Sequence, residues 1–211
     1  HYVDKALLAR TQSWLVAQQG SDGSFSVPEK GFYEIPGNAA KGALRTTAYV
    51  TWALAKSGYK GPALNQAVSY LRSQVQGVSE TYTQALVANA LLTLSSTDSD
   101  GLALLTKLEA SAIADGPDSA YWDSQGCSVT YGYGRSMTVE TTALVVGALL
   151  LGNKVGGYAN KGLRYLTLQK GAHGGYGTTQ ATVLSLRALL MALEARGGDQ
   201  ASGTLEVLHG G

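Results

Sequence analysis

Two short sequence patterns recur along the 211 residues of this chain, and their repetition constrains the fold more than any other feature. The first is an aromatic residue followed directly by Leu and, three positions later, by Gln. The second is Thr or Gln placed six residues before an Ala-Leu pair. The first pattern begins at Trp14, Tyr70 and Tyr165, and the second at Thr47, Gln84, Thr142 and Thr182. Such internal repeats are typical of stacked supersecondary units that bury a core only together.

The apolar residues follow helical spacing along most of the chain. This spacing predicts eight helices, at 3–19, 40–57, 62–76, 80–95, 100–113, 138–152, 159–170 and 178–196. Gly marks most of the breaks between them, and Pro62 lies just inside a helix start, where its missing N–H is not needed. The fold class is therefore predicted to be all-α.

The helices of the second pattern differ in composition from their neighbours. Those at 40–57, 138–152 and 178–196 are rich in Ala, Val, Thr and Gly and nearly free of charge, which predicts burial on most sides. The aromatic-Leu helices keep an exposed polar stripe. Pairing each inner helix with an outer one gives helical hairpins, which stack side by side into an open α/α toroid, or arc.

We expect one domain over residues 1–200. Residues 203–208 alternate like a short C-terminal β-strand, so 201–211 are predicted to be a tail or the start of a following β module. Because the chain already reads as helix at its first residues, we expect it to be a piece of a longer protein.

The charge balance argues against several partners. The net charge is +1 and no basic block occurs, so the chain lacks the field that nucleic acid or an anionic membrane surface requires. No apolar run is long enough to span a bilayer. Hydrophobic residues make up 45% and charged residues 15%, a lean polar surface that predicts contact with neighbouring modules.

Two long segments interrupt the helical rhythm, at 20–39 and 114–137. Long loops in compact domains are usually functional or interfacial, and both loops carry aromatic residues. If they meet at one end of the arc, they form a surface suited to protein or glycan contact; alternatively, the rings plug the mouth of the toroid. The candidate binding residues are Tyr33, Glu34, Tyr121, Trp122, Tyr131 and Tyr133.

Several strings resemble a known family. Ser13-Trp14-Leu15 with the Gln-Gln-x-x-Asp-Gly-Ser-Phe run at 18–25 is similar to the repeat shared by terpene cyclases, protein prenyltransferase β subunits and the thioester domains of alpha-2-macroglobulin and complement components. The later strings narrow the resemblance to the thioester domains. They are Arg-Thr-Thr-Ala-Tyr-Val at 45–50, Ala-Tyr-Trp at 120–122, Val-Glu-Thr-Thr-Ala-Leu at 139–144 and, most specific, Gly-Gly-Tyr-Gly-Thr-Thr-Gln-Ala-Thr at 174–182.

The resemblance covers nearly the whole chain, but only the later two-thirds of a family domain. It implies a bacterial-type member in the periplasm or outside the cell, whose parent molecule traps proteases or binds surfaces. The implied partners are other macroglobulin-type domains of the parent chain and a target protease or surface protein. In the family, the strand-like tail leads back into a β module.

The chain departs from the family at its reactive centre. The Cys-Gly-Glu-Gln run that forms the internal thioester is absent, and Cys127, the only cysteine, lies in the wrong segment. We interpret Cys127 as a partly buried small hydrophobe. The family histidine that assists acyl transfer would fall near Tyr33, and a tyrosine with a pKa of about 10 is a poor base at neutral pH. We therefore expect no catalysis and no cofactor.

Enzymatic alternatives find little support in the residues. Asp123, Cys127 and His173 do not have the spacing of a prenyltransferase zinc site. The Asp-Ser-Asp run at 98–100 lacks the last acid of a cyclase motif and suits helix capping. His173 accompanies no nucleophile motif, and the glycine-rich 171–177 segment precedes a helix without a phosphate-loop Lys.

Two structural roles follow for polar residues at the starts of the inner helices. Glu140 is placed to face the positive end of a helix dipole. The threonines at these starts are interpreted mostly as caps; they are Thr46, Thr47, Thr141, Thr142, Thr178 and Thr179.

Three functional hypotheses remain. The first is a non-catalytic helical module of an alpha-2-macroglobulin-like protein. The second is a toroid enzyme of the cyclase or prenyltransferase type, and the third is a free-standing helical repeat that binds peptides or glycans. A common concave wall formed around Thr47, Thr142 and Thr182 is the geometric expectation on which all three depend.

Overall fold

A computed structural model describes residues 4–26, 39–172 and 174–196 of the chain. Within them the chain forms eight α-helices, one 3-10 turn and a two-stranded antiparallel hairpin. The elements are α1 (Lys5–Val16), α2 (Ala39–Lys56), α3 (Pro62–Gln74), η1 (Val75–Gly77), α4 (Thr81–Leu94), α5 (Ser99–Ala110), β1 (Ile113–Ala114), β2 (Ala120–Tyr121), α6 (Arg135–Leu151), α7 (Gly157–Gln169) and α8 (Thr179–Ala195).

All eight predicted helices are confirmed, and so is the all-α class. The segment at 114–137 was predicted as loop, and this is wrong at both ends. It contains β2, which pairs with β1 in the register Ile113 to Tyr121, and α6 begins earlier than predicted, at Arg135. The predicted strand at 203–208 and the boundary at residue 200 lie outside the described residues.

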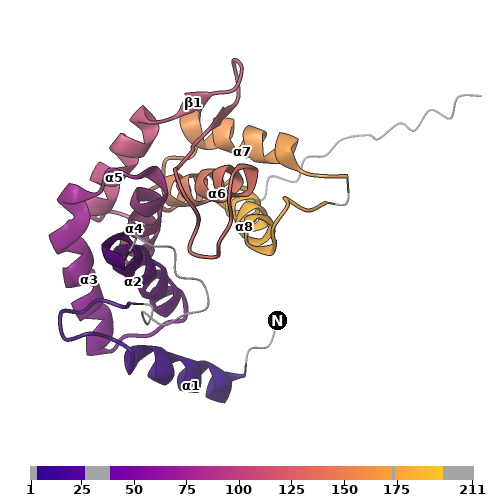
Figure 1. The fold of residues 1–211 in the computed structure, drawn as a ribbon. Helices are drawn as coiled ribbons and strands as arrows, with labels where there is room; N and C mark the ends of the chain where they lie inside the picture. Colours follow the sequence, from indigo (N-terminus) through magenta and orange to yellow (C-terminus); the bar gives the residue numbers. More distant parts are fainter. Residues whose placement is uncertain (1–3, 27–38, 173, 197–211) are drawn as a thin grey trace, which may run out of the picture.

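The helices form two layers of an arc (Figure 1). The even-numbered helices α2, α4, α6 and α8 lie inside, and the odd-numbered helices lie around them. Burial follows the composition: every residue from 82 to 92 in α4 and from 139 to 150 in α6 is buried. Because these helices carry few charges, they tolerate contact with neighbours on nearly every side.

A repeated hydrogen bond joins the loops to the inner helices. The backbone N–H of Phe25 donates to Thr47 Oγ1 at 2.8 Å. The N–H of Trp122 donates to Thr142 Oγ1 and that of Tyr176 to Thr182 Oγ1, each at 3.0 Å. All three threonines belong to the second sequence pattern. In the remaining copy, Gln84 Nε2 donates to the carbonyl of Val78 at 2.9 Å.

This hydrogen bond corrects the capping prediction for the inner-helix threonines. Thr178 is an N-cap, because its hydroxyl accepts the N–H of Ala181 at 3.1 Å. Thr47 and Thr142, in contrast, lie inside their helices and are fully buried. They bind the backbone of an incoming loop, and Thr141 donates to the carbonyl of Met137 in its own helix.

The first and last inner helices, α2 and α8, are joined by two side-chain contacts. Gln180 Nε2 of α8 donates to the Tyr49 hydroxyl of α2 at 3.0 Å. The Arg187 guanidinium lies 4.3 Å from the centre of the Trp52 ring. A gap of about 140 Å³ separates α2 from α8 here. The inner helices therefore surround a common centre, as expected, but the arc stays open.

The repeated hydrogen bond can be tested at Thr142. Replacing Thr142 by Val keeps the shape but leaves the buried N–H of Trp122 without its acceptor, so we expect the free energy of unfolding to fall by about 1–3 kcal/mol. Urea denaturation measures it. Thr106→Val, at an exposed position of α5, is the control and should change stability by less than about 0.5 kcal/mol. Equal stabilities for the two variants would contradict the role assigned to Thr142.

Candidate functional site

Residues 122–134 connect the β hairpin to α6 and cross the ends of the inner helices (Figure 1). Trp122 anchors the start of this segment. Its side chain is fully buried, and its indole Nε1 donates to the carbonyl of Leu108 at 2.6 Å. Trp122 was predicted to be a surface binding residue, but its ring lies in the core, where the Leu108 carbonyl of α5 accepts its indole N–H.

The Arg45 guanidinium fixes the middle of the segment. Its Nη1 donates to the carbonyl of Cys127 at 2.8 Å, and its Nη2 and Nε donate to the two oxygens of Glu80 at 2.5 and 3.2 Å. The guanidinium also lies over the Tyr82 ring, 5.5 Å from its centre. The Arg45 side chain is buried and binds Glu80 through two nitrogens. Because it also binds Thr83 and the Cys127 carbonyl, it joins α2, α4 and the 122–134 segment.

Glu80 is held in its charged form by its partners. Burial acts to raise the pKa of this carboxyl group, but hydrogen bonds from Arg45, Ser124 and Thr83 outweigh it, and the pKa lies below its ordinary value. Glu80 is thus an acceptor for three donors from three parts of the chain.

Glu140 lies under the end of the same segment in a different environment. It is fully buried, and its carboxylate accepts hydrogen bonds from the Thr178 and Thr130 hydroxyls at 3.3 and 3.4 Å. Among the described residues no cation pairs with it. Burial therefore raises the pKa of Glu140, although hydrogen bonds from Ser128 and the two threonines oppose the change.

The helix-dipole role predicted for Glu140 is wrong. Helix α6 begins at Arg135, so Glu140 lies beyond the first turn, where the dipole acts most strongly. Its carboxylate instead accepts hydrogen bonds from the hydroxyls of Thr130 in the 122–134 segment and Thr178 before α8. A Cβ on Gly132 would lie 2.5 Å from Glu140 Oε1, so only glycine fits at this close approach.

The segment presents two tyrosines to solvent, Tyr131 and Tyr133, whose exposed fractions are 49% and 58%. Tyr121 is separated from them because its ring stacks on Tyr165 of α7, with 5.1 Å between the ring centres. Tyr33 and Glu34 lie outside the described residues. Binding by these residues stays a prediction, and of the six candidates only Tyr131 and Tyr133 form an exposed pair within the described part of the chain.

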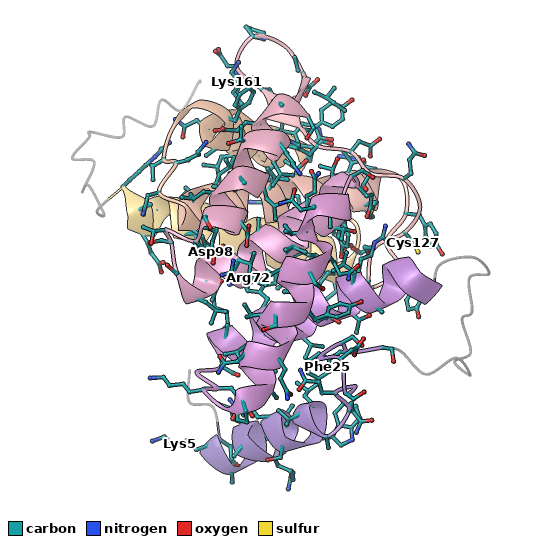
Figure 2. The ribbon with its side chains drawn as sticks, turned by 90° about the vertical axis from the view of Figure 1, so that its left-hand side faces the viewer. Lys5, Phe25, Arg72, Asp98, Cys127 and Lys161 are labelled. Atoms are coloured by element: carbon teal, nitrogen blue, oxygen red, sulfur yellow. The ribbon has the colours of Figure 1, made fainter. Side chains whose placement is uncertain are left out.

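Cys127 is buried, with 6% of its surface exposed, which confirms its interpretation as a small core residue. Figure 2 shows Cys127 at the edge of the molecule, far from the outer ion pair formed by Arg72 and Asp98. In the described part of the chain, no group of three or more His, Cys, Asp and Glu residues could hold a metal ion. His173 lies outside that part.

Sequence reasoning missed the buried charges. Arg45 and Glu140 are isolated charges in otherwise apolar inner helices, and such residues are almost never fully buried without partners. That contrast was visible in the strings at 45–50 and 139–144. The partners were not, because Glu80, Cys127 and Thr178 come from distant parts of the chain.

The stacked inner and outer helices define a class, the α/α toroids built from helical hairpins. Within that class, the family model described as A-macroglobulin TED domain, the thioester-containing domain, matches residues 1–191. The chain belongs to this family. It is 30% identical over 205 residues to ovostatin from Gallus gallus, which covers 89% of this chain and 13% of ovostatin. The chain thus spans about an eighth of that relative's length. No described helix is long and apolar enough to cross a membrane.

The role of Arg45 can be tested against an exposed ion pair. Arg45→Met removes the donors of Glu80 and of the Cys127 carbonyl, so we expect stability at neutral pH to fall by about 2–4 kcal/mol. Arg72→Met is the control: Arg72 is 42% exposed, so breaking its pairs with Asp98 and Asp100 should cost no more than about 1 kcal/mol. Chemical denaturation of both variants measures the difference.

The same pair predicts a pH dependence. Because the folded-state pKa of Glu80 is lowered, its contribution to stability is complete above the ordinary value of 4.5 and is lost as pH falls through the folded-state pKa. The stability difference between wild type and Arg45→Met should therefore shrink in acid. A difference that stays constant down to low pH would contradict the assignment.

Glu140 predicts the opposite sign. A raised folded-state pKa means that the folded protein binds more protons, so stability falls as pH rises from the ordinary value of 4.5 through the folded-state pKa. Glu140→Gln removes this charge and keeps the shape. We expect the variant to be more stable than wild type at pH 7–8 (chosen to lie well above the ordinary pKa). The advantage should vanish below about pH 4, and thermal unfolding across this range checks it.

Proposed function

We propose that this chain is a non-catalytic helical module of an alpha-2-macroglobulin-like protein and contributes to protease trapping or inhibition by protein contact. The membership of the A-macroglobulin thioester-domain family carries this proposal. The absence of a Cys-Gly-Glu-Gln run from the 211 residues supports a module without its own thioester. The buried Cys127 thiol supports it further, because a thiol enclosed by protein is a poor nucleophile.

The parent protein supplies the partners in this proposal. Since the chain spans 13% of ovostatin, other macroglobulin-type domains of the same parent chain are its first partners. The target protease or a surface protein is the second. We also propose that the protein is located outside the cell or, in a bacterium, in the periplasm.

The contact surface in this proposal is the 122–134 segment. Arg45 binds its Cys127 carbonyl and Glu140 binds its Thr130 hydroxyl, so little conformational entropy remains to be lost when a partner binds. Tyr131 and Tyr133 supply large amphipathic rings, which are enriched in binding hot spots.

A free-standing peptide or glycan binder is the second candidate, favoured by the same exposed tyrosines. The two candidates differ in what the isolated chain does. A free-standing binder captures its ligand alone, whereas a macroglobulin module acts only within the parent. A toroid enzyme of the cyclase or prenyltransferase type needs an acid cluster or metal ligands, which the described residues do not assemble.

The test uses the full-length parent protein mixed with a protease. A trapped protease keeps its activity on a small peptide substrate and loses activity on a large protein substrate, because only the small substrate reaches the enclosed enzyme. We expect this split for the parent and no effect from the isolated chain. A protease that keeps both activities in the presence of the parent would contradict protease trapping.

The tyrosine surface is tested in the same assay. Tyr133→Ala in the parent should lower the amount of protease captured by about tenfold, the size of a moderate hot spot. Leu168→Ala is the matched control, since Leu168 of α7 is 61% exposed and Tyr133 58%. Equal losses in the two variants would mean that surface apolarity in general, and not this segment, matters.

A further inference from the structure

Residues 128–134 form the last part of the 122–134 segment, and we call them the 128–134 turn. Arg45 holds the Cys127 carbonyl at 2.8 Å just before the turn, and α6 begins just after it. Most of the turn faces solvent, but Gly132 within it is buried. The exposed residues are Thr130, Tyr131, Tyr133 and Gly134. The turn is therefore held at both of its ends and has an outer side that faces water.

Glu140 lies on the inner side of this turn. A Cβ placed on Gly132 would lie 2.5 Å from Glu140 Oε1 and 3.1 Å from Ser128 Oγ, so the backbone and the carboxylate are in direct contact. Glu140 itself is fully buried. On this side, the 128–134 turn is what separates the carboxyl group from solvent.

The nearest groups give Glu140 hydrogen bonds but no positive charge. The hydroxyls of Thr178 and Thr130 lie 3.3 and 3.4 Å from its oxygens, and the Ser128 hydroxyl contributes a third hydrogen bond. Within the described residues, no Lys, Arg or His lies at ion-pair distance from it. A charge on Glu140 is thus solvated by hydroxyl groups alone while the turn is closed.

Helices α4 and α2 add no counter-ion on the far side of the turn. From α4, the Tyr82 hydroxyl accepts the N–H of Val129 at 3.2 Å. Burial raises the pKa of Tyr82, and the nearby charge of Glu140 adds to this rise, so Tyr82 stays neutral. The Arg45 guanidinium of α2 lies over the Tyr82 ring and is already paired with Glu80.

The hydrogen bonds that close the turn lie within it. The N–H of Ser128 donates to the Gly132 carbonyl and that of Tyr131 to the Ser128 carbonyl, both at 3.0 Å, and the N–H of Gly132 donates to Ser128 Oγ at 2.9 Å. Tyr131 has a φ of 62°, in the left-handed region that a bulky residue rarely adopts. The turn can therefore open, and release this conformation, while the helices beneath stay packed.

Ionisation of Glu140 favours the open turn. A buried carboxylate without a cation is costly, and burial raises the pKa of Glu140 while the turn is closed. Opening admits water and returns the group to its ordinary pKa. Because the open form then releases a proton more readily than the closed form, the fraction of open turns rises with pH between the two pKa values.

We propose that the 128–134 turn is a proton-controlled cover over Glu140, which stays closed while the carboxyl group is protonated and opens locally to water when the group ionises. Tyr131 and Tyr133 lie on this turn, so its opening displaces the contact surface of the proposed function. The cover itself does not depend on that function. The closed surface persists in mild acid and is progressively lost as the pH rises.

Hydrogen exchange of the full-length parent protein, followed by mass spectrometry, tests the proposal. A peptide within residues 128–134 reports the bonded amides of the turn. A peptide containing Phe25, whose N–H is bound by Thr47, reports a loop without a buried carboxylate. Wild type and Glu140→Gln are compared at each pH from about 4 to about 8. Because the turn has the same sequence in both proteins, the ratio of their exchange rates isolates its opening.

We expect the turn to exchange several-fold faster in wild type than in Glu140→Gln at about pH 7–8. The two rates should become equal near pH 4, where the carboxyl group is protonated in the open and the closed form. The Phe25 peptide should exchange equally in both proteins. Glu109→Gln is the matched control, since it removes a carboxylate that pairs with Lys154 away from the cover, and its turn should exchange as in wild type.

A ratio between wild type and Glu140→Gln that stays at one across this pH range would overturn the proposal. So would an equal rise in the turn and the Phe25 peptide, because that marks unfolding of the domain and not opening of a cover. If Glu140→Gln does not fold, wild type alone decides: corrected for intrinsic exchange, protection of the turn must fall with pH relative to the Phe25 peptide. Exchange reports opening and not inhibition, so a failure here is separate from a failure of the protease assay.

Discussion

The hydrogen bond between a loop N–H and an inner-helix threonine is the interaction on which the arrangement of this domain depends. Inner helices with few polar groups offer little to a loop that must cross them, and a buried backbone N–H needs an acceptor. Thr47, Thr142 and Thr182 each provide one. The residue whose N–H is bound is aromatic in every case, and its ring enters the hairpin interior. In these three repeats, one residue thus both pairs its backbone N–H and fills the core.

The ionisable residues of the inner helices extend this arrangement to the mouth of the arc. Arg45 has a counter-ion and two further acceptors, the Thr83 hydroxyl and the Cys127 carbonyl, whereas within the described residues Glu140 has hydroxyl donors alone. Both contact the 122–134 segment, Arg45 at the Cys127 carbonyl and Glu140 at the Thr130 hydroxyl. Burial disfavours the charged form of both Glu80 and Glu140. Within the described residues only Glu80 has an opposite charge beside it, which explains why the pKa of Glu140 rises while that of Glu80 falls. The segment is therefore held by a strong contact with Arg45 and by a weaker contact with Glu140 that depends on pH.

The helices and the layering were predictable because a period near 3.6 and a lack of charge are both properties of adjacent residues. The β hairpin was not, since two-residue strands are too short to show alternation. Trp122 was placed on the surface because a loop aromatic gives no local sign of the direction of its ring. Its acceptor, Thr142, lies 20 residues away, and Arg45 and the Cys127 carbonyl are separated by 82. Contacts of this kind depend on the curvature of the whole stack, which no local pattern encodes.

The curvature also leaves the ends of the arc in an unusual state. A stack of helical hairpins is stable in water when its terminal units present polar faces, because each internal unit relies on a neighbour to cover its apolar side. Here α1 has no buried residue and exposes Leu7 and Trp14, while α8 exposes Val183, Leu186, Leu190 and Leu193. Both ends therefore have the apolar character of internal units. Among the described residues, Arg187 has no carboxylate in ion-pair distance and Trp52 Nε1 has no acceptor. The opening between α2 and α8 thus combines exposed apolar side chains with polar groups for which the described residues provide few partners.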